Sequence, residues 1–521
     1  MYDGETYEEF ETPEQVIERL EDEEACVYAH NGGKFDYHYL RKYINTDEKI
    51  MLIGGRLARF RIGECEFRDS MNLFTFALAA YQKEKIDYNL MEAENRNDPN
   101  NRAIISRYLR SDCVNLYELV TAFFANYGRN LTQAGAAMRV WSHMSGMRPP
   151  KQTVTQYNDH KNFYFGGRVE CFVSGHGLRQ FKVVDLNSAY PDAMTNEHPI
   201  SCNSALTTKL PNDSKLERCF AVIKARSDGA LPFISEDGAV RTLEFPRDDI
   251  VREYYVTGWE LAAALETNSL KIIEIVEVRQ FDQYINFREY VDRFYALKKS
   301  SKTAGDKAQE LFAKIFLNAL YGKFAANPLS YFEYLLSRDD NKDFYNEQGW
   351  DEDSQWGEDR YLMRRGLPDE KQRRYNVATA ASITGYVRAH LWRSMAACRG
   401  VLYCDTDSIA AEDVSKLSLG PNLGQWKLEM ECSEYAVAGK KTYAYRKTAD
   451  WLAAERAASS EPESIKEWKT ASKGCKLSHS EIIDVAEGRA VTFRPDVPTY
   501  SIHRHEPIFI ARNVRNTAVV H

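Results

Sequence analysis

The sequence lacks the marks of a membrane, secreted or disulfide-stapled protein. It has no N-terminal signal peptide and no apolar run of about 18 residues, so we expect no membrane role. Its ten cysteines are scattered without a CxxC pair, which indicates neither a zinc site nor a disulfide framework. Such cysteines are typical of reduced thiols in an intracellular protein.

The sequence also lacks an excess of positive charge. Its 68 Lys and Arg residues are outnumbered by 76 Asp and Glu residues, whereas binding to a phosphate backbone needs Lys and Arg. The acids are concentrated in residues 1–24 and 339–359, however, so the rest of the chain can still form a basic channel. At 521 residues the chain is longer than one core usually allows, and we expect several domains.

An apolar run with two carboxylates stands out at residues 401–410, VLYCDTDSIA. Asp405 and Asp407 either straddle a hairpin turn or lie at i and i+2 on one face of a strand. Two like charges so close together are unfavourable without a cation between them. Carboxylate oxygens suit Mg²⁺ and Mn²⁺, so the pattern indicates a metal site, with a solvated turn as the alternative.

A second strand-like segment, residues 181–191 (FKVVDLNSAYP), ends in Asp185. One aspartate from a strand and another from a distant hairpin is the arrangement needed for two-metal nucleotidyl transfer. Such a site holds two cations about 3.5–4 Å apart.

A third segment, residues 309–327, has apolar residues at helical spacing. Lys314, Asn318 and Tyr321 fall on the opposite face of this predicted helix, and Gly322 follows without a side chain. Lys314 is therefore a candidate to bind a triphosphate.

In this order, the segments DLNSAYP, KIFLNALYG and YCDTDS resemble the A, B and C motifs of family B DNA polymerases. Ala189 and Ala319 depart from the Leu and Ser of those motifs. Residues 164–167 (YFGG) resemble the family's YxG(G/A) motif, and residues 441–443 (KTY) its KxY motif. The short spacings and the run YGKFAANP are similar to the protein-primed branch of bacteriophages, archaeal viruses and linear plasmids.

The resemblance implies a multidomain α+β and α/β fold: a right-hand polymerase with palm, fingers and thumb, preceded by an incomplete ribonuclease-H-like 3′–5′ exonuclease domain. The implied division is 1–150, exonuclease-like; 151–200, linker and first part of the palm; 201–286, an insertion that docks a terminal protein; 287–328, fingers; 329–375, a second insertion; 376–478, palm; and 479–521, thumb. The second insertion would close a tunnel around DNA.

The resemblance also implies site residues. Asp185, Asp405 and Asp407 are the expected catalytic and metal-binding residues, with two Mg²⁺ ions that Mn²⁺ can replace. The expected nucleotide-binding residues are Leu186, Tyr190, Lys302, Lys314, Asn318, Tyr321 and Gly322. The expected DNA-binding residues are Tyr164, Gly166, Gly167, Lys441 and Tyr443. Simpler alternatives are a core aromatic for Tyr190, a surface lysine for Lys302 and an ordinary edge strand for residues 441–443.

The exonuclease-like half matches its family only in part. Asn31 and Asp36 resemble the second exonuclease motif, Tyr108 and Asp112 the third, and Lys83 the additional catalytic lysine of the branch. The only candidate for the first motif, DGE at residues 3–5, lies too close to the second for the hairpin and helix between them. We interpret it as a turn, with the first strand missing because the chain starts at an internal Met, and we do not expect proofreading.

The expected partners are a DNA template and primer, deoxynucleoside triphosphates and a terminal protein. We expect a monomer in the cytoplasm of a host cell. Two alternatives stay open: a family B polymerase that uses a nucleic-acid primer, and a DNA-binding remnant that no longer synthesises DNA.

Overall fold

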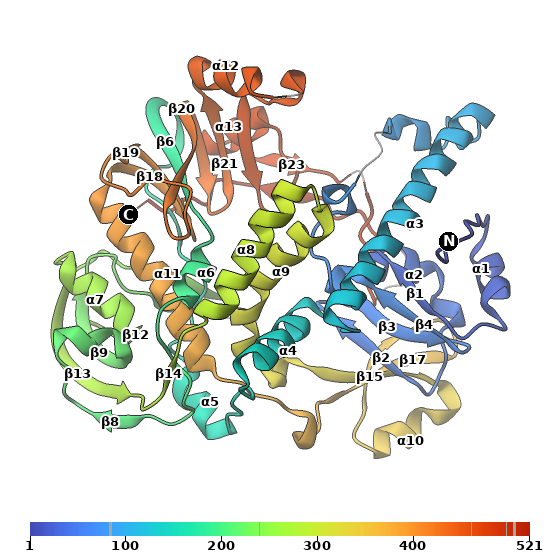
Figure 1. The fold of residues 1–521 in the computed structure, drawn as a ribbon, viewed down its shortest axis with the longest axis horizontal. Helices are drawn as coiled ribbons and strands as arrows, with labels where there is room; N and C mark the ends of the chain where they lie inside the picture. The colour runs from blue at the N-terminus through green and yellow to red at the C-terminus, as the bar shows by residue number, and fades with distance from the viewer. Residues whose placement is uncertain (83–85, 239, 460, 496, 504–506, 521) are drawn as a thin grey trace.

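The computed structural model describes residues 1–82, 86–238, 240–459, 461–495, 497–503 and 507–520. Lys83 therefore lies outside the described residues. Runs of strands and runs of helices follow one another along the chain, and a large sheet lies on each side of a central pair of helices (Figure 1). We call these the N-terminal sheet and the central sheet.

Strand β1 forms one edge of the N-terminal sheet and pairs in parallel with β4. The first elements of this part of the chain are α1 (Pro13–Leu20), β1 (Cys26–Ala29), α2 (Asp36–Tyr39), β2 (Lys49–Ile53), β3 (Arg56–Ile62) and β4 (Cys65–Asp69). Helix α1 begins where the Thr12 side chain accepts a hydrogen bond from the Gln15 N–H, with Pro13 in its first turn. The DGE segment is a turn, as predicted, because Asp3 Oδ1 accepts the N–H groups of Glu5 and Thr6.

The second insertion continues the N-terminal sheet. Its elements are β15 (Phe332–Arg338), α10 (Lys342–Glu347), β16 (Asp351–Gln355) and β17 (Arg360–Gly366). Strand β15 pairs with β2, with Tyr334 opposite Ile50, and the strand order is β1-β4-β3-β2-β15-β17-β16. Leu336 and Leu362 therefore share a buried core with Phe60 of β3.

Long helices lead from this sheet to the middle of the molecule. They are α3 (Pro99–Tyr127), α4 (Gln133–Ser145) and α5 (Val154–Lys161). The ring of Phe123 in α3 packs edge-on against Phe312 at 5.3 Å and stacks on Phe316 at 6.1 Å. These contacts join α3 to the central helices.

The central helices form an antiparallel pair, α8 (Arg288–Ala304) and α9 (Lys307–Phe324). Gly305 ends α8 with a positive φ of 74°, a conformation that glycine adopts without strain. Asp306 begins α9 by accepting the Gln309 N–H at 3.0 Å. As the apolar spacing predicted, α9 buries one face and leaves Lys314 and Asn318 exposed on the other.

The central sheet has the strand order β22-β21-β20-β6-β19-β18-β5. Its elements and flanking helices are β5 (Val169–Cys171), β6 (Gly175–Leu186), α6 (Ala189–Met194), α11 (Val377–Ala397), β18 (Arg399–Asp405), β19 (Ser408–Asp413), β20 (Trp426–Gly439), β21 (Thr442–Lys447), α12 (Ala449–Ala457), β22 (Trp468–Ser472) and α13 (His479–Ala486). Leu320 of α9, Ile383 of α11 and Ile409 of β19 belong to one buried cluster. The central helices and the central sheet thus share a core.

Residues 201–286 mostly form a smaller unit beside α11. It contains the sheet β12-β9-β13-β8, the hairpin β10-β11 and helix α7. The bounds are β8 (Ala205–Thr207), β9 (Cys219–Ser227), β10 (Phe233–Asp237), β11 (Val240–Glu244), β12 (Arg252–Thr257), α7 (Gly258–Glu266) and β13 (Leu270–Gln280); β7 (His198–Pro199) pairs with β14 (Tyr284–Ile285) at its base.

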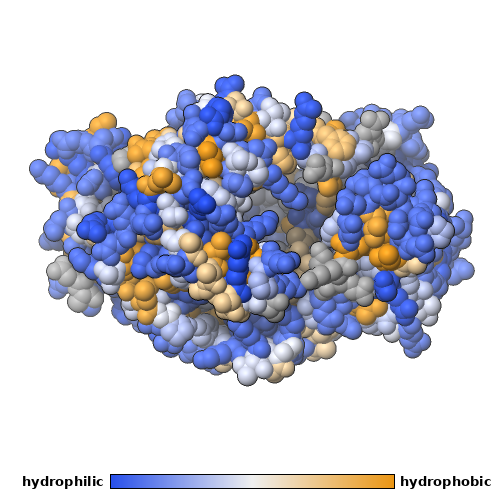
Figure 2. All heavy atoms as spheres, turned by 90° about the horizontal axis from the view of Figure 1, so that it is seen from above, coloured by the Kyte–Doolittle hydropathy of each residue, from blue (hydrophilic) through white to orange (hydrophobic). Residues whose placement is uncertain are grey.

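The C-terminal segment runs back to the N-terminal sheet. Strand β23 (Val491–Phe493) pairs with β24 (Arg512–Val514) next to α13, and the chain between them carries Ile502 into the core of the N-terminal sheet. No helix among the described residues is long and apolar enough to cross a bilayer. Seen from above, the surface is mostly hydrophilic and is hollowed near its middle (Figure 2).

Candidate active site

The predicted carboxylates meet where β6 and the β18–β19 hairpin end. Ser408 of the hairpin lies opposite Asp185 of β6, and the hairpin carries Asp405 and Asp407 at its tip. Of the two arrangements left open by the sequence, the structure has the hairpin. Thr406 takes a left-handed φ of 59° in the turn, and the Leu186 N–H donates to the Asp407 carbonyl at 2.7 Å. That N–H is therefore already engaged within the chain.

Asp185 and Asp407 repel each other in a partly buried place. Burial, the charge of Asp407 and the charge of Glu429 raise the pKa of Asp185 to about 7. Burial and the charge of Asp405 also raise the pKa of Asp407. A divalent cation would relieve this repulsion, and two carboxylates are the oxygen donors that Mg²⁺ and Mn²⁺ prefer. The residues present thus fit a metal site.

Asp405 is turned toward a lysine. Its Oδ1 lies 3.1 Å from the Lys441 ammonium and accepts the Thr406 hydroxyl at 3.2 Å. Throughout the described residues, no group of three or more His, Cys, Asp or Glu side chains is arranged around a common metal position. Asp185 and Asp407 are thus the pair best placed for a cation, with Asp405 beside them.

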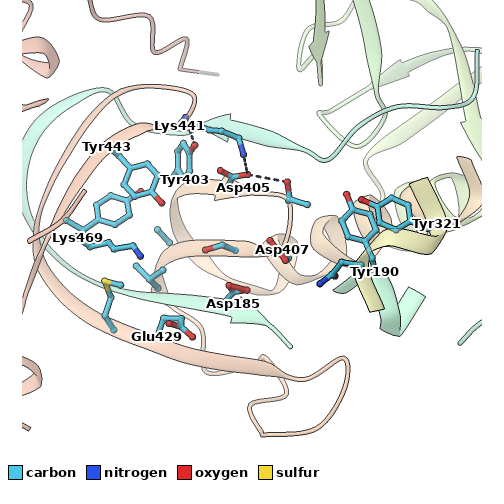
Figure 3. A pocket seen from close by; sticks show the side chains of 17 residues that line it. Asp185, Tyr190, Tyr321, Tyr403, Asp405, Asp407, Glu429, Lys441, Tyr443 and Lys469 are labelled. Carbon is cyan, nitrogen blue, oxygen red and sulfur yellow. Dashed lines mark hydrogen bonds and ion pairs between the residues drawn. The ribbon is translucent and has the colours of Figure 1, made fainter. Parts of the chain in front are cut away.

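A cavity of about 570 Å³ opens over these carboxylates. Asp185, Asp407 and Glu429 lie together in it, and the Lys441 side chain reaches Asp405 (Figure 3). Tyr190 and Tyr321 lie on one side, and Tyr443 and Lys469 on the other (Figure 3). Asn318 lines the cavity as well.

The tyrosines on the finger side form a stack. The rings of Tyr190 and Tyr321 are 4.1 Å apart with their planes at 9°. Burial raises the pKa of Tyr321, and the nearby Tyr190 and Tyr164 raise it further, so Tyr164 lies close to the stack. Gly322 follows Tyr321 on an open face, where an added Cβ would meet nothing within 4 Å.

The predicted triphosphate-binding lysines lie on the central helix pair, Lys302 in α8 and Lys314 in α9. Burial, followed by the charges of Lys314 and Lys302, lowers the pKa of Lys298, so the three ammonium groups are neighbours. Lys314 and Asn318 line a second cavity of about 270 Å³, between α9 and the segment of Thr75 and Phe76. Neither Lys302 nor Lys314 lines the cavity of the carboxylates.

The glycine pair, Gly166 and Gly167, lies beside the turn that carries Asp405 and Asp407. A Cβ on Gly167 would lie 2.5 Å from the Thr406 hydroxyl, so only glycine fits at that position. Gly166 is exposed, and the carbonyls of Phe165 and Gly166 accept hydrogen bonds from Arg388.

The sequence also led us to expect residues 440–443 within one strand, and this was wrong for Lys441. It occupies the turn between β20 and β21 with a positive φ of 61°, and its N–H donates to the Tyr403 hydroxyl at 2.8 Å. The turn is what lets its side chain bend back to Asp405. Tyr443 lies in β21, where its ring stacks on Tyr445 at 4.5 Å.

The exonuclease-like residues gather around a carboxylate that the sequence reasoning missed. Asp69, at the end of β4, accepts the N–H groups of Asn31, Gly33 and Met71. Burial and the charge of Asp69 raise the pKa of Asp36. Asp69 is therefore committed to holding the loop that precedes Asp36.

The third exonuclease-like motif lies on α3 beside the same loop. Burial, Tyr88 and Asp112 raise the pKa of Tyr108. Burial lowers the pKa of His30 against the charges of Asp69 and Asp112, which places both carboxylates near this histidine.

Sequence reasoning also missed Glu429 and Lys469 of the cavity. Lys427 of β20 lies opposite Asp185, and Glu429 follows two residues later on the same strand. The alternation of side chains along β20 could have suggested that Lys427 and Glu429 share one face of the sheet. It could not have shown that this face lies beside Asp185, because β20 and β6 are far apart in the sequence.

A carboxylate pair from a strand and a hairpin, facing a helix pair with exposed lysines, defines the palm and fingers of a nucleotide polymerase. The family described as "DNA polymerase type B, organellar and viral" matches residues 64–391. A DNA-directed DNA polymerase of Enterobacteria phage PRD1 is 33% identical over 539 residues, covering 99% of this chain and 94% of that protein. A DNA polymerase of Bacillus phage Nf is 23% identical over 283 residues, covering 50% of this chain and 44% of that protein.

Solved structures share the fold over almost the whole chain. The orthorhombic crystal form of Phi29 DNA polymerase gives a TM-score of 0.71 at 16% identity, covering 97% of this chain and 93% of that one. Its ternary complex with primer-template DNA and incoming nucleotide substrates gives a TM-score of 0.70 at 15% identity, with the same coverage. The predicted mixed α/β multidomain fold is confirmed.

The chain belongs to the organellar and viral branch of the type B DNA polymerases. This confirms the resemblance found in its motifs, and the protein is a DNA-directed DNA polymerase of the protein-primed viral and plasmid type.

Proposed function

We propose that this polymerase replicates a linear viral or plasmid genome in the cytoplasm of a host cell, adding deoxynucleotides to a 3′-hydroxyl by a two-metal reaction. The observation that carries the proposal is the partly buried pair Asp185 and Asp407 at the foot of the cavity. Phosphoryl transfer needs mostly positioning and electrostatic stabilisation, and this pair offers a place for both.

Asp185 and Asp407 would hold two Mg²⁺ ions, which Mn²⁺ can replace. When bound, such ions lower the pKa of the primer hydroxyl and neutralise charge on the triphosphate. Asp405 contributes negative charge from the edge, where its ion pair with Lys441 at 3.1 Å fixes both side chains.

The residues around the pair suit an incoming nucleotide. The stack of Tyr190 and Tyr321 offers a flat apolar wall for a sugar and a nascent base pair. Lys302 and Lys314, with Lys298 beside them, form a positive cluster for the triphosphate. Lys302 and Lys314 do not line the cavity of the carboxylates. We therefore propose that the helix pair moves toward Asp185 and Asp407 when a nucleotide binds.

The primer and template would lie against Lys441, Tyr443 and the loop of Gly166 and Gly167. Lys441 presents an ammonium group and Tyr443 a ring at one side of the cavity, which suits a phosphate and its sugar. The glycine loop presents bare backbone beside Thr406 of the catalytic turn.

Two further proposals concern priming and proofreading. Residues 201–286 would dock a terminal protein whose hydroxyl receives the first nucleotide, since they form a separate unit at the position of that insertion. The exonuclease-like residues would not proofread, because Asp36 and Asp112 match only the second and third motifs, and the reaction needs two metal ions held in place.

The test is extension of a labelled primer on a long single-stranded template with Mg²⁺, comparing the wild type with Asp407→Ala. Metal-assisted charge stabilisation contributes several kcal/mol, and about 4 kcal/mol corresponds to about a 1,000-fold loss of rate. Asp413→Asn, at the other end of the same hairpin, is the matched control and should extend normally. A wild type that binds DNA without extending it would favour the remnant alternative.

Priming is tested separately by adding a candidate terminal protein and labelled nucleotide. Covalent transfer of a nucleotide to that protein supports protein priming. Extension of a nucleic-acid primer without any such transfer favours the alternative of an ordinary primer.

A further inference from the structure

Two arginines beside the glycine loop are buried. Arg388 is 2% exposed and Arg168 is fully buried, which is rare for a charged side chain unless it is paired. Each has a carboxylate partner, Glu260 for Arg388 and Glu170 for Arg168. Desolvating charges is costly, so both pairs need further contacts to offset it.

Arg388 of α11 binds a carboxylate and two loop carbonyls at once. Its Nε donates to Glu260 Oε1 at 2.7 Å, and its Nη1 donates to the carbonyls of Phe165 at 2.7 Å and Gly166 at 2.9 Å. The guanidinium group is planar and its donors form a rigid fork, so these bonds fix the loop relative to α7.

The carbonyls held by Arg388 determine where the loop N–H groups point. In a trans peptide the N–H is directed opposite to the carbonyl. With the carbonyls of Phe165 and Gly166 turned to the buried guanidinium, the N–H groups of Gly166 and Gly167 are directed away from it. Gly166 is exposed, with open space around its Cα. Bare backbone N–H groups in such a place suit phosphate oxygens.

Arg168 ties the other side of the loop to the catalytic turn. Its carbonyl accepts the Thr406 N–H at 2.6 Å. Its guanidinium lies 4.0 Å from the ring centroid of Phe245 and 4.7 Å from that of Trp392. Burial alone would raise the pKa of Glu170, but its two arginine partners, Arg168 and Arg247, hold that pKa below its usual range.

Both networks reach into residues 201–286. Glu260 also accepts the Thr257 N–H at 3.0 Å, and Gly385 of α11 is packed so tightly on Thr257 that a Cβ would lie 2.2 Å from its hydroxyl. Arg247 donates to Glu170 at 2.7 Å. The glycine loop is thus held between this unit and the turn of Asp405 and Asp407.

We propose that Arg388 and Glu260 are positioning residues that orient the N–H groups of Gly166 and Gly167 toward DNA phosphates and couple this loop to residues 201–286. The inference rests on the proposed function, because it requires that the loop binds DNA during synthesis. It adds the residues that set the orientation of the glycine loop. It also names the contacts that connect residues 201–286 to the turn of Asp405 and Asp407.

The test compares full-length Arg388→Lys and Glu260→Gln with the wild type. Lysine keeps the charge but loses the fork, and glutamine keeps the shape but loses the charge. Glu274→Gln is the matched control, because Glu274 pairs with Lys224 at an exposed site of the same unit. We measure kcat, the KM for primer–template DNA, the Kd for that DNA without nucleotides, and Tm.

We expect Arg388→Lys to raise the KM and Kd for DNA at least fivefold, with kcat at saturating DNA within twofold of the wild type. Glu260→Gln should shift both constants in the same direction by less, and Glu274→Gln should leave them unchanged. Wild-type KM and Kd in Arg388→Lys, or a fall in kcat with unchanged KM, would overturn the inference.

The two ideas fail in different ways. If the wild type does not extend a primer, the proposed function fails. The Kd of the variants for DNA still shows whether the glycine loop contributes to DNA binding. If Arg388→Lys does not fold, Glu260→Gln decides alone, since glutamine retains the size of the original side chain and one of its two acceptor oxygens. A Kd that rises only in proportion to the fraction unfolded would show a merely structural role.

Discussion

Tyr190 and Tyr321 are stacked with ring centroids 4.1 Å apart, although one belongs to α6 and the other to α9. Tyr190 follows Asp185 by five residues, and Tyr321 lies two turns beyond Lys314 on the finger helix. The stack therefore connects α9, which carries Lys314, to the segment that follows Asp185 of β6.

Removing one ring should weaken nucleotide binding. A stacked aromatic pair is worth about 1 kcal/mol beyond its buried area, and about 1.4 kcal/mol corresponds to tenfold. We expect Tyr321→Ala to raise the KM for deoxynucleotides about fivefold in steady-state primer extension. Tyr321→Phe keeps the ring and should behave as the wild type. Equal impairment of the two variants would contradict a role for the stack.

The meeting of Asp185 and Asp407 could be predicted from the sequence because its signals are local. A short apolar strand that ends in a carboxylate, and a turn with two carboxylates, are readable within ten residues. Whether the two carboxylates straddle a hairpin turn or share one strand depends on the pairing of β18 with β19, which the structure shows. The exposed face of α9 was predictable for the same reason, from spacing alone.

The rest depends on contacts between distant segments. Pairing of β15 with β2 makes the second insertion part of the N-terminal sheet, and no local pattern encodes that pairing. Glu429 reaches the cavity only because β20 lies beside β6. The predicted position of Lys441 was wrong because a lysine rarely adopts a left-handed φ. The residue type therefore gave no indication of the turn.

The exonuclease-like half should not shorten DNA. Asp36 and Asp112 match the second and third motifs, but the DGE segment that spells the first motif is a turn held by Asp3, and hydrolysis needs two metal ions in place. We expect a labelled 3′ end to keep its length in Mg²⁺ or Mn²⁺ without deoxynucleotides, as scored on a denaturing gel. Asp36→Asn should give the same result. Shortening by the wild type that Asp36→Asn abolishes would contradict the prediction.

His176 should make stability depend on pH. Its ring lies 2.7 Å from Glu434 and 3.0 Å from Glu487, and these hydrogen bonds, that of Glu434 first, raise the pKa of His176. A raised folded-state pKa stabilises the protein fully below the unfolded value, about 6.5. That contribution is lost as the pH rises through the folded value.

His176 lies at the surface although Glu434 is buried, so we expect the contribution of this pair to stay below about 1 kcal/mol. We expect His176→Gln to lower Tm at pH 6 and to match the wild type above pH 8, as measured by calorimetry. His143→Gln, an exposed histidine of α4, is the control and should leave Tm unchanged at both values. A constant Tm difference across this range would contradict an ionic origin.

The contact of Trp356 with Ile502 should affect how far the enzyme travels on each binding event. Trp356 Nε1 donates to the Ile502 carbonyl at 2.7 Å, and Arg41 covers the indole ring at 4.1 Å and donates to the same carbonyl. The C-terminal segment is thereby fastened to the N-terminal sheet and its insertion, far from its base at β23 and β24. The second insertion is expected to close a tunnel around DNA, and we predict that releasing this segment would open that tunnel.

We expect Ile502→Ala, which removes buried methyl groups and costs about 2–5 kcal/mol locally, to shorten the products of a single binding event. The single-turnover rate of adding one nucleotide should stay unchanged, because neither residue lines the catalytic cavity. Extension in the presence of a DNA trap measures the first quantity, and rapid quench the second. Trp350→Phe is the control, since Trp350 packs under Arg365 in the same insertion and belongs to a different buried cluster from Ile502. If Ile502→Ala gives products of wild-type length, the fastened segment does not retain DNA, and processivity must depend on other contacts.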